Sequence, residues 1–366
     1  MPQLEAWEQV FVSDEEFPAS THGQVGCTTC HGGVPGATDM EEAHTGITVD
    51  PDPITTCGTC HEDTTDDHVG SLHATLGGYD TVLLARSGGD ELSPGLEEAF
   101  TNHCASCHAS CGQCHVSRPT SAGGGLLAGH SFKETPPMNL TCTGCHGSRI
   151  ENEYKGKNET DDGGMYPADV HYNPGGMACF TCHTGDDMHG VGPEQELRYD
   201  GAQDPACTDC HPDLEGANAQ HTAWHLDALS CQVCHSVAYK NCYSCHVQKS
   251  EEGVPYFETD ESQMLFYIGK NPTPTDDRPW SWVTVRHVPV DQDSFSYYGD
   301  DLLPEFDARP TWLYATPHNI QRSTPQNASC DACHGNASIF LTEDKVDPVE
   351  LDANRSVIVT EIPGGG

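Results

Sequence analysis

The sequence predicts a mostly irregular fold of low secondary-structure content, with short α-helices and one small β-rich insert. Three observations support this prediction. Only 36% of the 366 residues are hydrophobic, below the share of about 45–50% that is usual for globular chains. The chain holds 37 glycines and 25 prolines, which favour tight turns over long helices and strands. A five-residue motif, Cys-x-x-Cys-His, recurs along the chain and uses all 20 cysteines.

Each copy of the motif places two thiols three positions apart and a histidine directly after the second thiol. The copies, numbered one to ten in chain order, are Cys27/Cys30/His31, Cys57/Cys60/His61, Cys104/Cys107/His108, Cys111/Cys114/His115, Cys142/Cys145/His146, Cys179/Cys182/His183, Cys207/Cys210/His211, Cys231/Cys234/His235, Cys242/Cys245/His246 and Cys330/Cys333/His334. No thiol is therefore left over for a disulfide, a free nucleophile or a separate metal site.

This motif is typical of covalent haem attachment, because the two thiols can add to the two vinyl groups of one haem while the histidine ligates its iron. Zinc ribbons, which also use paired Cys-x-x-Cys, are the alternative, but they do not need a histidine after every second cysteine. Ten haems in 366 residues leave about 37 residues for each (366/10), too few to wrap every haem in its own globule. The predicted fold is therefore short α-helices at the motifs, around a covalent haem array, with the β-rich insert beside it.

The second axial ligands are expected among the twelve histidines outside the motifs, since imidazole is a common haem ligand. Ten of them are predicted to be ligands: His22, His44, His73, His103, His130, His171, His189, His225, His287 and His318. His44, His130 and His318 recur at a similar distance upstream of a motif and are expected to ligate a neighbouring haem. His68 and His221 are left out, because each lies four or five residues from a better-placed histidine.

Four segments are expected along the chain. Residues 1–26 are an acidic N-terminal segment, 27–246 a nine-haem array, 247–329 a segment without cysteine, and 330–366 the tenth motif with a C-terminal tail. The cysteine-free segment is rich in aromatic residues and is predicted to be a β-rich insert that lends His287 and His318 to the array. A structural cap without ligands is the alternative for this segment.

Local patterns predict a few individual elements. Leu72–Arg86 and Ser93–Ala105 are expected to be short helices, the second opening on Ser-Pro, which suits an N-cap and a first-turn proline. Val283–Val290 alternates as a half-buried strand does, and Pro289 favours the edge of a sheet. Ser356–Ile362 is also strand-like.

The third and fourth motifs are packed into His103–His115 with only Ala109 and Ser110 between them. Two residues cannot span a porphyrin, so the haems of these two motifs are expected to lie almost in contact.

The chain is strongly acidic, with 16 basic and 56 acidic residues and a formal net charge of −40. This charge excludes nucleic acid as an expected partner. It is typical of a well-solvated surface, or of adaptation to high salt, where screening weakens self-repulsion. No apolar run approaches the roughly 18–20 residues of a membrane helix, so no transmembrane segment is expected. The first residues lack signal-peptide features; we expect an export signal removed from this numbering and a secreted or cell-surface location.

With these motifs the chain resembles multihaem c-type cytochromes, in particular the secreted cytochromes of microbial extracellular electron transfer. The resemblance implies low-spin, bis-histidine haems that pass electrons to redox partner proteins or extracellular acceptors, and an electron carrier rather than an enzyme. The alternative is a multihaem reductase of the nitrite, hydroxylamine or tetrathionate type with one open haem site, although no motif here ends in lysine. Self-association of subunits into a cytochrome filament is a third reading, since an open heterologous contact produces fibres.

Overall fold

The chain forms two compact units in the computed structural model, each assembled from interleaved stretches. Unit 1 comprises Met1–Leu76, Ser106–His146 and His183–Glu196, and unit 2 comprises Gly77–Ala105, Gly147–Cys182 and Leu197–Gly366. The structure describes residues 12, 16–105, 109–119, 122–192, 198, 205–242, 245–259, 261–288 and 291–364. Regular structure is limited to 36% helix and 11% strand, in short helices and small sheets, which confirms the prediction of low secondary-structure content.

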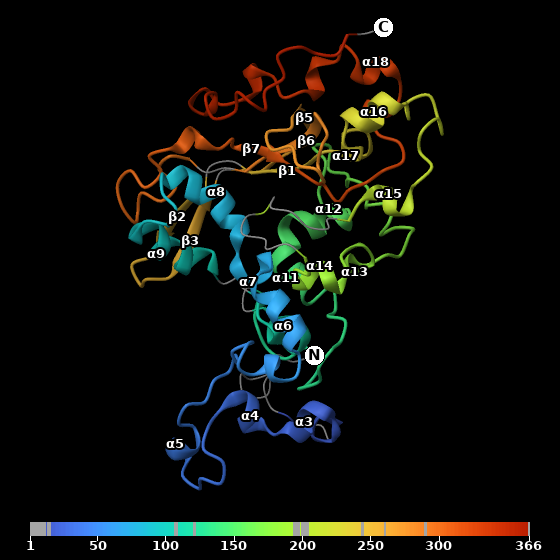
Figure 1. Ribbon diagram of the computed structural model, residues 1–366. Coiled ribbons are helices and arrows are strands. Elements are labelled where there is room, and N and C mark those ends of the chain that lie inside the picture. Colours follow the sequence, from blue (N-terminus) through green and yellow to red (C-terminus); the bar gives the residue numbers. More distant parts are fainter. Residues whose placement is uncertain are drawn as a thin grey trace. The chain divides into compact units, whose positions relative to one another are not determined.

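Unit 1 is built from short helices joined by turns (Figure 1). These are α2 (Glu16–Ala19), α3 (Thr21–Val25), α4 (Cys27–His31), α5 (Met40–Ala43), α6 (Glu62–Val69), α7 (Leu72–Thr75), α10 (Cys111–His115), α11 (Cys142–His146) and α14 (Gly185–His189), with the 3-10 turn η1 (Cys57–Thr59). Side-chain caps set where several begin: Ser20 accepts a hydrogen bond from the Gly23 amide at 3.0 Å, and Asp39 one from the Glu42 amide at 3.1 Å.

The helix predicted over Leu72–Arg86 is wrong in its extent. Leu76 adopts a left-handed conformation (φ 59°) and separates α7 from α8 (Gly77–Ser87), which belongs to unit 2. Gly77 and Gly78 follow this break, and glycine lowers helix propensity because its backbone is unrestrained when unfolded.

The helix predicted over Ser93–Ala105 is confirmed as α9 (Pro94–His103). The Ser93 hydroxyl accepts a hydrogen bond from the Leu96 amide at 3.4 Å, and Pro94 occupies the first turn, where its missing N–H has no helical partner to lose.

Unit 2 combines short helices with three small antiparallel sheets (Figure 1). Its remaining helices are α12 (Asn152–Tyr154), α13 (Cys179–Cys182), α15 (Cys207–Cys210), α16 (Ala223–Ala228), α17 (Cys231–His235) and α18 (Cys330–Cys333), with the π-helical turn η4 (Gly147–Glu151) and the 3-10 turns η5 (Phe306–Ala308), η6 (Pro325–Asn327), η7 (Ala337–Ile339), η8 (Glu343–Lys345) and η9 (Pro348–Glu350). Its strands are β1 (Tyr239–Asn241), β2 (Cys245–Lys249), β3 (Pro255–Thr259), β4 (Gln263–Leu265), β5 (Tyr267–Lys270), β6 (Trp282–His287) and β7 (Trp312–Tyr314).

The strand expected over Val283–Val290 is present as β6, but its predicted edge position is wrong. β6 lies between β5 and β7, with Val285 opposite both Tyr267 and Tyr314. The strand ends at His287, and Pro289 and Val290 of the predicted strand lie outside the described residues.

Two further corrections concern β-structure. The sheets begin before residue 247, because β1 and β2 lie at 239–249 and β2 contains part of the ninth motif. The predicted strand Ser356–Ile362 is absent. Its Val357 and Val359 instead make single backbone hydrogen bonds to Lys270 and Leu341, at 2.9 and 2.8 Å. Bonds to two different segments do not form a ladder with either.

Apolar burial differs sharply between the units. Unit 2 holds three clusters of buried side chains, one under α8 and α9, one on the β5–β6–β7 sheet, and one that includes Cys234 and Cys333. In the described part of unit 1, the buried apolar side chains are Val116 and Pro119. The described part of unit 1 therefore lacks an apolar core made of protein side chains. Burial of apolar surface is the main source of folding free energy, at about 25 cal/mol for each Å² that is buried.

Candidate haem-ligand pairs

Most of the predicted attachment motifs sit on a short helical turn. Seven of them form α4, α10, α11, α13, α15, α17 and α18. A helical turn places residues three apart on one face, so both thiols of such a motif point to the same side. No disulfide joins the described cysteines. Cys107 and His108 of the third motif lie outside the described residues.

The short helix expected at each motif is incomplete at the second one, which is a correction to the prediction. The 3-10 turn η1 ends at Thr59, so Cys60 and His61 lie beyond it. The Cys60 N–H closes the turn by donating to the Cys57 carbonyl at 3.1 Å. Cys57 is half-buried, whereas the Cys60 thiol is exposed. The two thiols of this motif therefore differ in their surroundings, and attachment of a haem at Cys60 stays a prediction.

Exposure of a thiol is not confined to the second motif. The other motif cysteines that the chain leaves exposed are Cys27, Cys145, Cys182, Cys207, Cys210 and Cys330. The protein's own side chains therefore do not cover the motif cysteines at these positions. The physical reason is the low apolar content, which gives these thiols few neighbours to cover them. An accessible thiol is what addition to a haem vinyl group requires.

Seven motif histidines face the imidazole of a histidine from outside the motifs. The pairs and their ring-centroid distances are His31–His130 (5.8 Å), His61–His22 (6.2 Å), His115–His189 (6.2 Å), His146–His73 (6.4 Å), His211–His171 (6.3 Å), His235–His221 (6.2 Å) and His334–His225 (6.2 Å). Four of these pairs lie in unit 1 and three in unit 2.

This spacing fits one metal ion held between two imidazoles. Two metal–nitrogen bonds of about 2.0–2.1 Å, with about 1 Å from each nitrogen to its ring centre, add to about 6 Å. Rings in direct contact would not need to repeat this one distance, since their separation varies between about 4.5 and 7 Å. The donor set, two thiols and two imidazoles, matches what a covalently attached haem requires.

No family model, curated protein or solved structure matches the chain. Among the described residues, no helix is long and apolar enough to cross a membrane. The function is therefore argued from the histidine pairs and their surroundings.

The second ring nitrogen of many paired histidines is held by a hydrogen-bond acceptor. Nδ1 lies against a backbone carbonyl in His31 (Thr48, 2.8 Å), His115 (Lys133, 2.5 Å), His235 (Gln321, 2.9 Å), His334 (Gly364, 3.0 Å) and His225 (Gln220, 2.7 Å), and against the Asp169 carboxylate in His171 (2.9 Å). Since these oxygens only accept, Nδ1 carries the proton and Nε2 keeps its lone pair. Metal-ligating histidines usually show this arrangement.

The protonation of the pairs also suits metal binding. Burial, and then the charge of the facing motif histidine, lowers the pKa of His22, His73 and His189 below the usual value. A lowered pKa keeps the imidazole neutral at pH 7, and only the neutral form donates a lone pair to a metal.

Two phenylalanines position the ligands of the first and second motifs. Phe132 stacks on His22 with a centroid distance of 3.9 Å, and Phe17 meets His130 edge-on at 4.6 Å. The rings of Phe17 and Phe132 are themselves 6.3 Å apart. Side-chain packing thus fixes the orientation of both imidazoles.

A cavity in unit 2 brings the groups of the tenth motif together. Cys333, His334 and His225 line it with the apolar side chains of Trp224, Trp282 and Phe340 among others. A thiol, both imidazoles and aromatic walls around one cavity are what a haem at this motif would contact.

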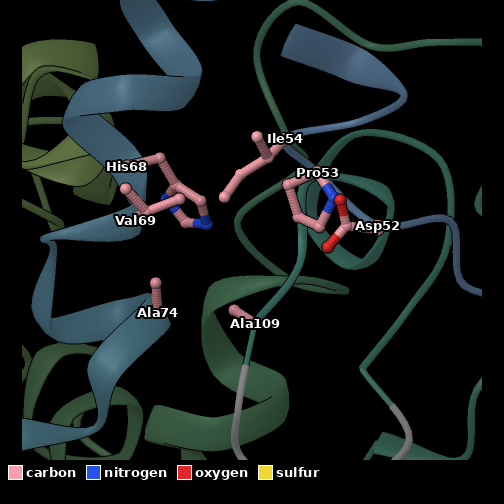
Figure 2. A pocket seen from close by; sticks show the side chains of 7 residues that line it. All are labelled: Asp52, Pro53, Ile54, His68, Val69, Ala74 and Ala109. Atoms are coloured by element: carbon pink, nitrogen blue, oxygen red, sulfur yellow. The ribbon is translucent and has the colours of Figure 1, made fainter.

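A cavity in unit 1 involves His68, which the sequence analysis left out (Figure 2). It has a volume of about 230 Å³ and is lined by Asp52, Pro53, Ile54, His68, Val69, Ala74 and Ala109. The His68 side chain is 8% exposed and points across the cavity toward Ile54. Ala109 directly follows His108 in the sequence, so the third motif adjoins this cavity along the chain.

His221, also left out, faces His235. The sequence argument placed it too close to His225 to be a separate ligand. In the structure Thr222 caps α16, so His221 precedes the helix while His225 lies within it. The two rings therefore face different motif histidines, His235 and His334. His68 and His73 are separated in the same way, by the break between α6 and α7.

Three predicted ligands are placed differently from expectation. His44 is exposed and faces no imidazole in the described part of the chain. The Nε2 atom of His103 lies 2.8 Å from the Tyr298 hydroxyl. Both ring nitrogens of His287 contact the protein, Nε2 the Glu350 carboxylate at 2.9 Å and Nδ1 the Cys242 carbonyl at 2.5 Å. These contacts engage the Nε2 atom of His103 and both ring nitrogens of His287.

The remaining predicted ligands keep protein contacts that orient them. The Nδ1 atom of His183 lies 2.7 Å from the Asp187 carboxylate. The backbone N–H of half-buried His318 donates to the buried Glu153 carboxylate at 2.9 Å.

Thiols of different motifs also lie close together, which indicates which motifs are neighbours. A hydrogen bond with Cys57 lowers the pKa of Cys111 to about 7, and one with Cys207 lowers the pKa of Cys231 to about 7. The second motif is thus beside the fourth, and the seventh beside the eighth. Weaker interactions, second to burial, pair Cys114 with Cys145, Cys182 with Cys210, Cys234 with Cys333 and Cys104 with Cys245.

Proposed function

We propose that the chain is a decahaem c-type cytochrome that transfers electrons through ten covalently bound haems. The observation that carries the proposal is the set of seven motif histidines, each facing a second imidazole at 5.8–6.4 Å. Ten intact motifs and the near-absence of an apolar core in unit 1 support it, because haems would supply the missing buried surface.

The residues of the chain would have different roles in binding the haems. The motif cysteines would anchor the haems, and the paired histidines would hold the iron at the seven motifs that have such a pair. The carbonyl and carboxylate acceptors at Nδ1 fix the ring orientations and raise ligand basicity. When bound, an iron with two imidazoles exchanges one electron with little change of geometry and has no open position for substrate. The net charge of −40 stabilises the more positive, oxidised state and favours low potentials.

The neighbouring thiols suggest the order of the haems within each unit. In unit 1, a hydrogen bond between Cys57 and Cys111, with electrostatic interactions between Cys30 and Cys57 and between Cys114 and Cys145, supports the order first, second, fourth and fifth motif. In unit 2, a hydrogen bond between Cys207 and Cys231, with electrostatic interactions between Cys182 and Cys210 and between Cys234 and Cys333, supports the order of the cysteines of the sixth, seventh, eighth and tenth motifs. The first series follows the order of the sequence but omits the third motif. The second series also follows it but omits the ninth motif.

His68 is a further candidate ligand in unit 1. It is buried, lines the cavity of Figure 2, and lies in a separate helix from His73. Its ring lies 6.4 Å from that of His189, a distance like those of the seven pairs.

We further propose a secreted or cell-surface protein that exchanges electrons with redox partner proteins or extracellular acceptors. Covalent attachment through this motif is the property that supports an extracytoplasmic location. Filament formation and a monomeric carrier are the two assembly states to separate. Negative-stain electron microscopy of the purified holoprotein distinguishes them directly, since a filament shows a regular axial repeat.

The experiment that tests the function is a haem and metal analysis of the purified protein. Covalent haem remaining after acid-acetone extraction, low-spin ferric signals and reversible reduction are expected. Stoichiometric zinc without haem would refute the proposal in favour of zinc ribbons.

A further inference from the structure

The ninth motif differs from the other described motifs in its local structure. Cys245 and His246 begin strand β2 instead of lying on or beside a helical turn. The polar groups around the His246 ring are carboxylates: Asp291 lies 3.6 Å from Nε2 and Asp293 lies 3.9 Å from Nδ1. Glu258 is its cross-strand partner on β3. In the described part of the chain, no imidazole ring packs against His246.

Two histidines expected to serve as second ligands in this unit have their Nε2 atoms engaged by other side chains. His103 precedes the third motif, and its Nε2 lies 2.8 Å from the Tyr298 hydroxyl. His287 is only 4% exposed. Its Nε2 atom is hydrogen-bonded to the Glu350 carboxylate and its Nδ1 atom to the Cys242 carbonyl. Turning His287 toward an iron would leave the Glu350 carboxylate, only 3% exposed, without this partner, and loss of a hydrogen bond to a buried charged group is unfavourable.

We propose that the haem position formed by Cys242, Cys245 and His246 keeps the side opposite His246 open to a small exogenous ligand, and that the surrounding carboxylates favour neutral ligands over anions. The inference rests on the proposed function, because it assumes that the ninth motif carries a haem. The neutral class is represented by carbon monoxide and the anionic class by cyanide. Asp291, Asp293 and Glu258 lie on the His246 side of this position, so they do not contact a ligand on the open side. Their negative charges act across the haem position, and this like-charge repulsion weakens the binding of an anion.

The ninth motif also has a neighbour through which electrons can reach it. Helix α9 packs against strand β3 (Figure 1). The Lys249 ammonium lies 3.0 Å from the Glu98 carboxylate, and the His103 ring lies 5.3 Å from Phe257. These contacts place Cys104 beside Cys245. The third and ninth motifs therefore form a side pair, apart from the series of the sixth, seventh, eighth and tenth motifs.

The test is ligand binding by the complete holoprotein. The dithionite-reduced protein should take up about one equivalent of carbon monoxide, and the oxidised protein should show one high-spin haem. In the double variant Cys242→Ser/Cys245→Ser, the mass should fall by one haem and carbon monoxide uptake should disappear. The matched control, Cys207→Ser/Cys210→Ser, removes a haem whose His211 faces His171. It should also lose one haem but keep the uptake.

Ten low-spin haems without carbon monoxide uptake would overturn the inference while leaving the proposed function intact, whereas absence of covalent haem would overturn both. Uptake that persists without the ninth haem would assign the open position elsewhere and also overturn it. A further variant, Asp291→Asn, does not depend on haem removal. It should strengthen cyanide binding about threefold to tenfold with little effect on carbon monoxide. Unchanged cyanide affinity would refute the role of the carboxylates.

Discussion

Replacing His221 with alanine tests the histidine pairs at the position where sequence spacing and structure disagree. The His221 and His235 rings are 6.2 Å apart, which leaves room for one metal ion and no more. Alanine retains only the Cβ atom, so no other atom of residue 221 can reach the metal. One haem should therefore change from low-spin to high-spin, a loss of about one-ninth of the signal from the nine haems that are expected to be low-spin.

The assay combines electron paramagnetic resonance of the oxidised protein with carbon monoxide titration of the reduced protein. His221→Ala should bind about one equivalent more carbon monoxide than the unsubstituted protein. Added imidazole should restore the low-spin state, because it can occupy the space that the side chain left.

The matched control is His44→Ala. His44 is a histidine that spacing favoured as a ligand, but it is exposed and faces no imidazole among the described residues. Its replacement should leave the spectrum and the carbon monoxide uptake unchanged. A spectral change in His44→Ala, or its absence in His221→Ala, would show that the ring pairs do not identify the ligands.

Three further predictions follow from the motifs, the cores and a buried ion pair. The mature protein should carry ten covalent haems by intact mass, and a mass corresponding to nine or fewer would mean that a motif is not loaded. In haem-free protein, proteases should cut throughout the described part of unit 1, which buries only Val116 and Pro119 among its apolar side chains, but should spare the β5–β6–β7 sheet; equal cleavage of both would contradict this reasoning. Glu153→Gln should destabilise unit 2 by about 3–5 kcal/mol, because it leaves the buried Arg286 guanidinium without its ion-pair partner. Asp352→Asn, in an exposed ion pair, should change the melting temperature little, and equal effects of the two variants would contradict the role of burial.

Close coupling of the third and fourth haems stays a prediction. The two-residue spacing still requires adjacency along the chain, but Cys107 and His108 lie outside the described residues. The described thiols add neighbours that the spacing did not indicate. Cys111 of the fourth motif lies against Cys57, and Cys104 of the third motif lies beside Cys245. Spatial order therefore departs from chain order at these motifs.

The sequence by itself determined the features that depend on a few consecutive residues. The motif alone specifies which thiols and which histidine belong together, because a spacing of three positions on a helical turn places both thiols on one side. The helix start at Ser93 and Pro94 was likewise predictable, since a helix N-terminus is stabilised by the residues that form it. The low apolar content also indicated that the protein could not build every core from its own side chains.

Only the tertiary structure decided which histidine faces which motif. His31 meets His130 and His61 meets His22, partners that come from downstream in one case and upstream in the other. Spacing along the chain favoured His44 and argued against His221, and the cysteine-free segment was expected to lend His287. Whether an imidazole can bind depends instead on contacts made by distant segments. The cap at Thr222 turns His221 away from His225, and Glu350 occupies His287. Such contacts arise from the packing of the whole unit, and no local pattern in the sequence records them.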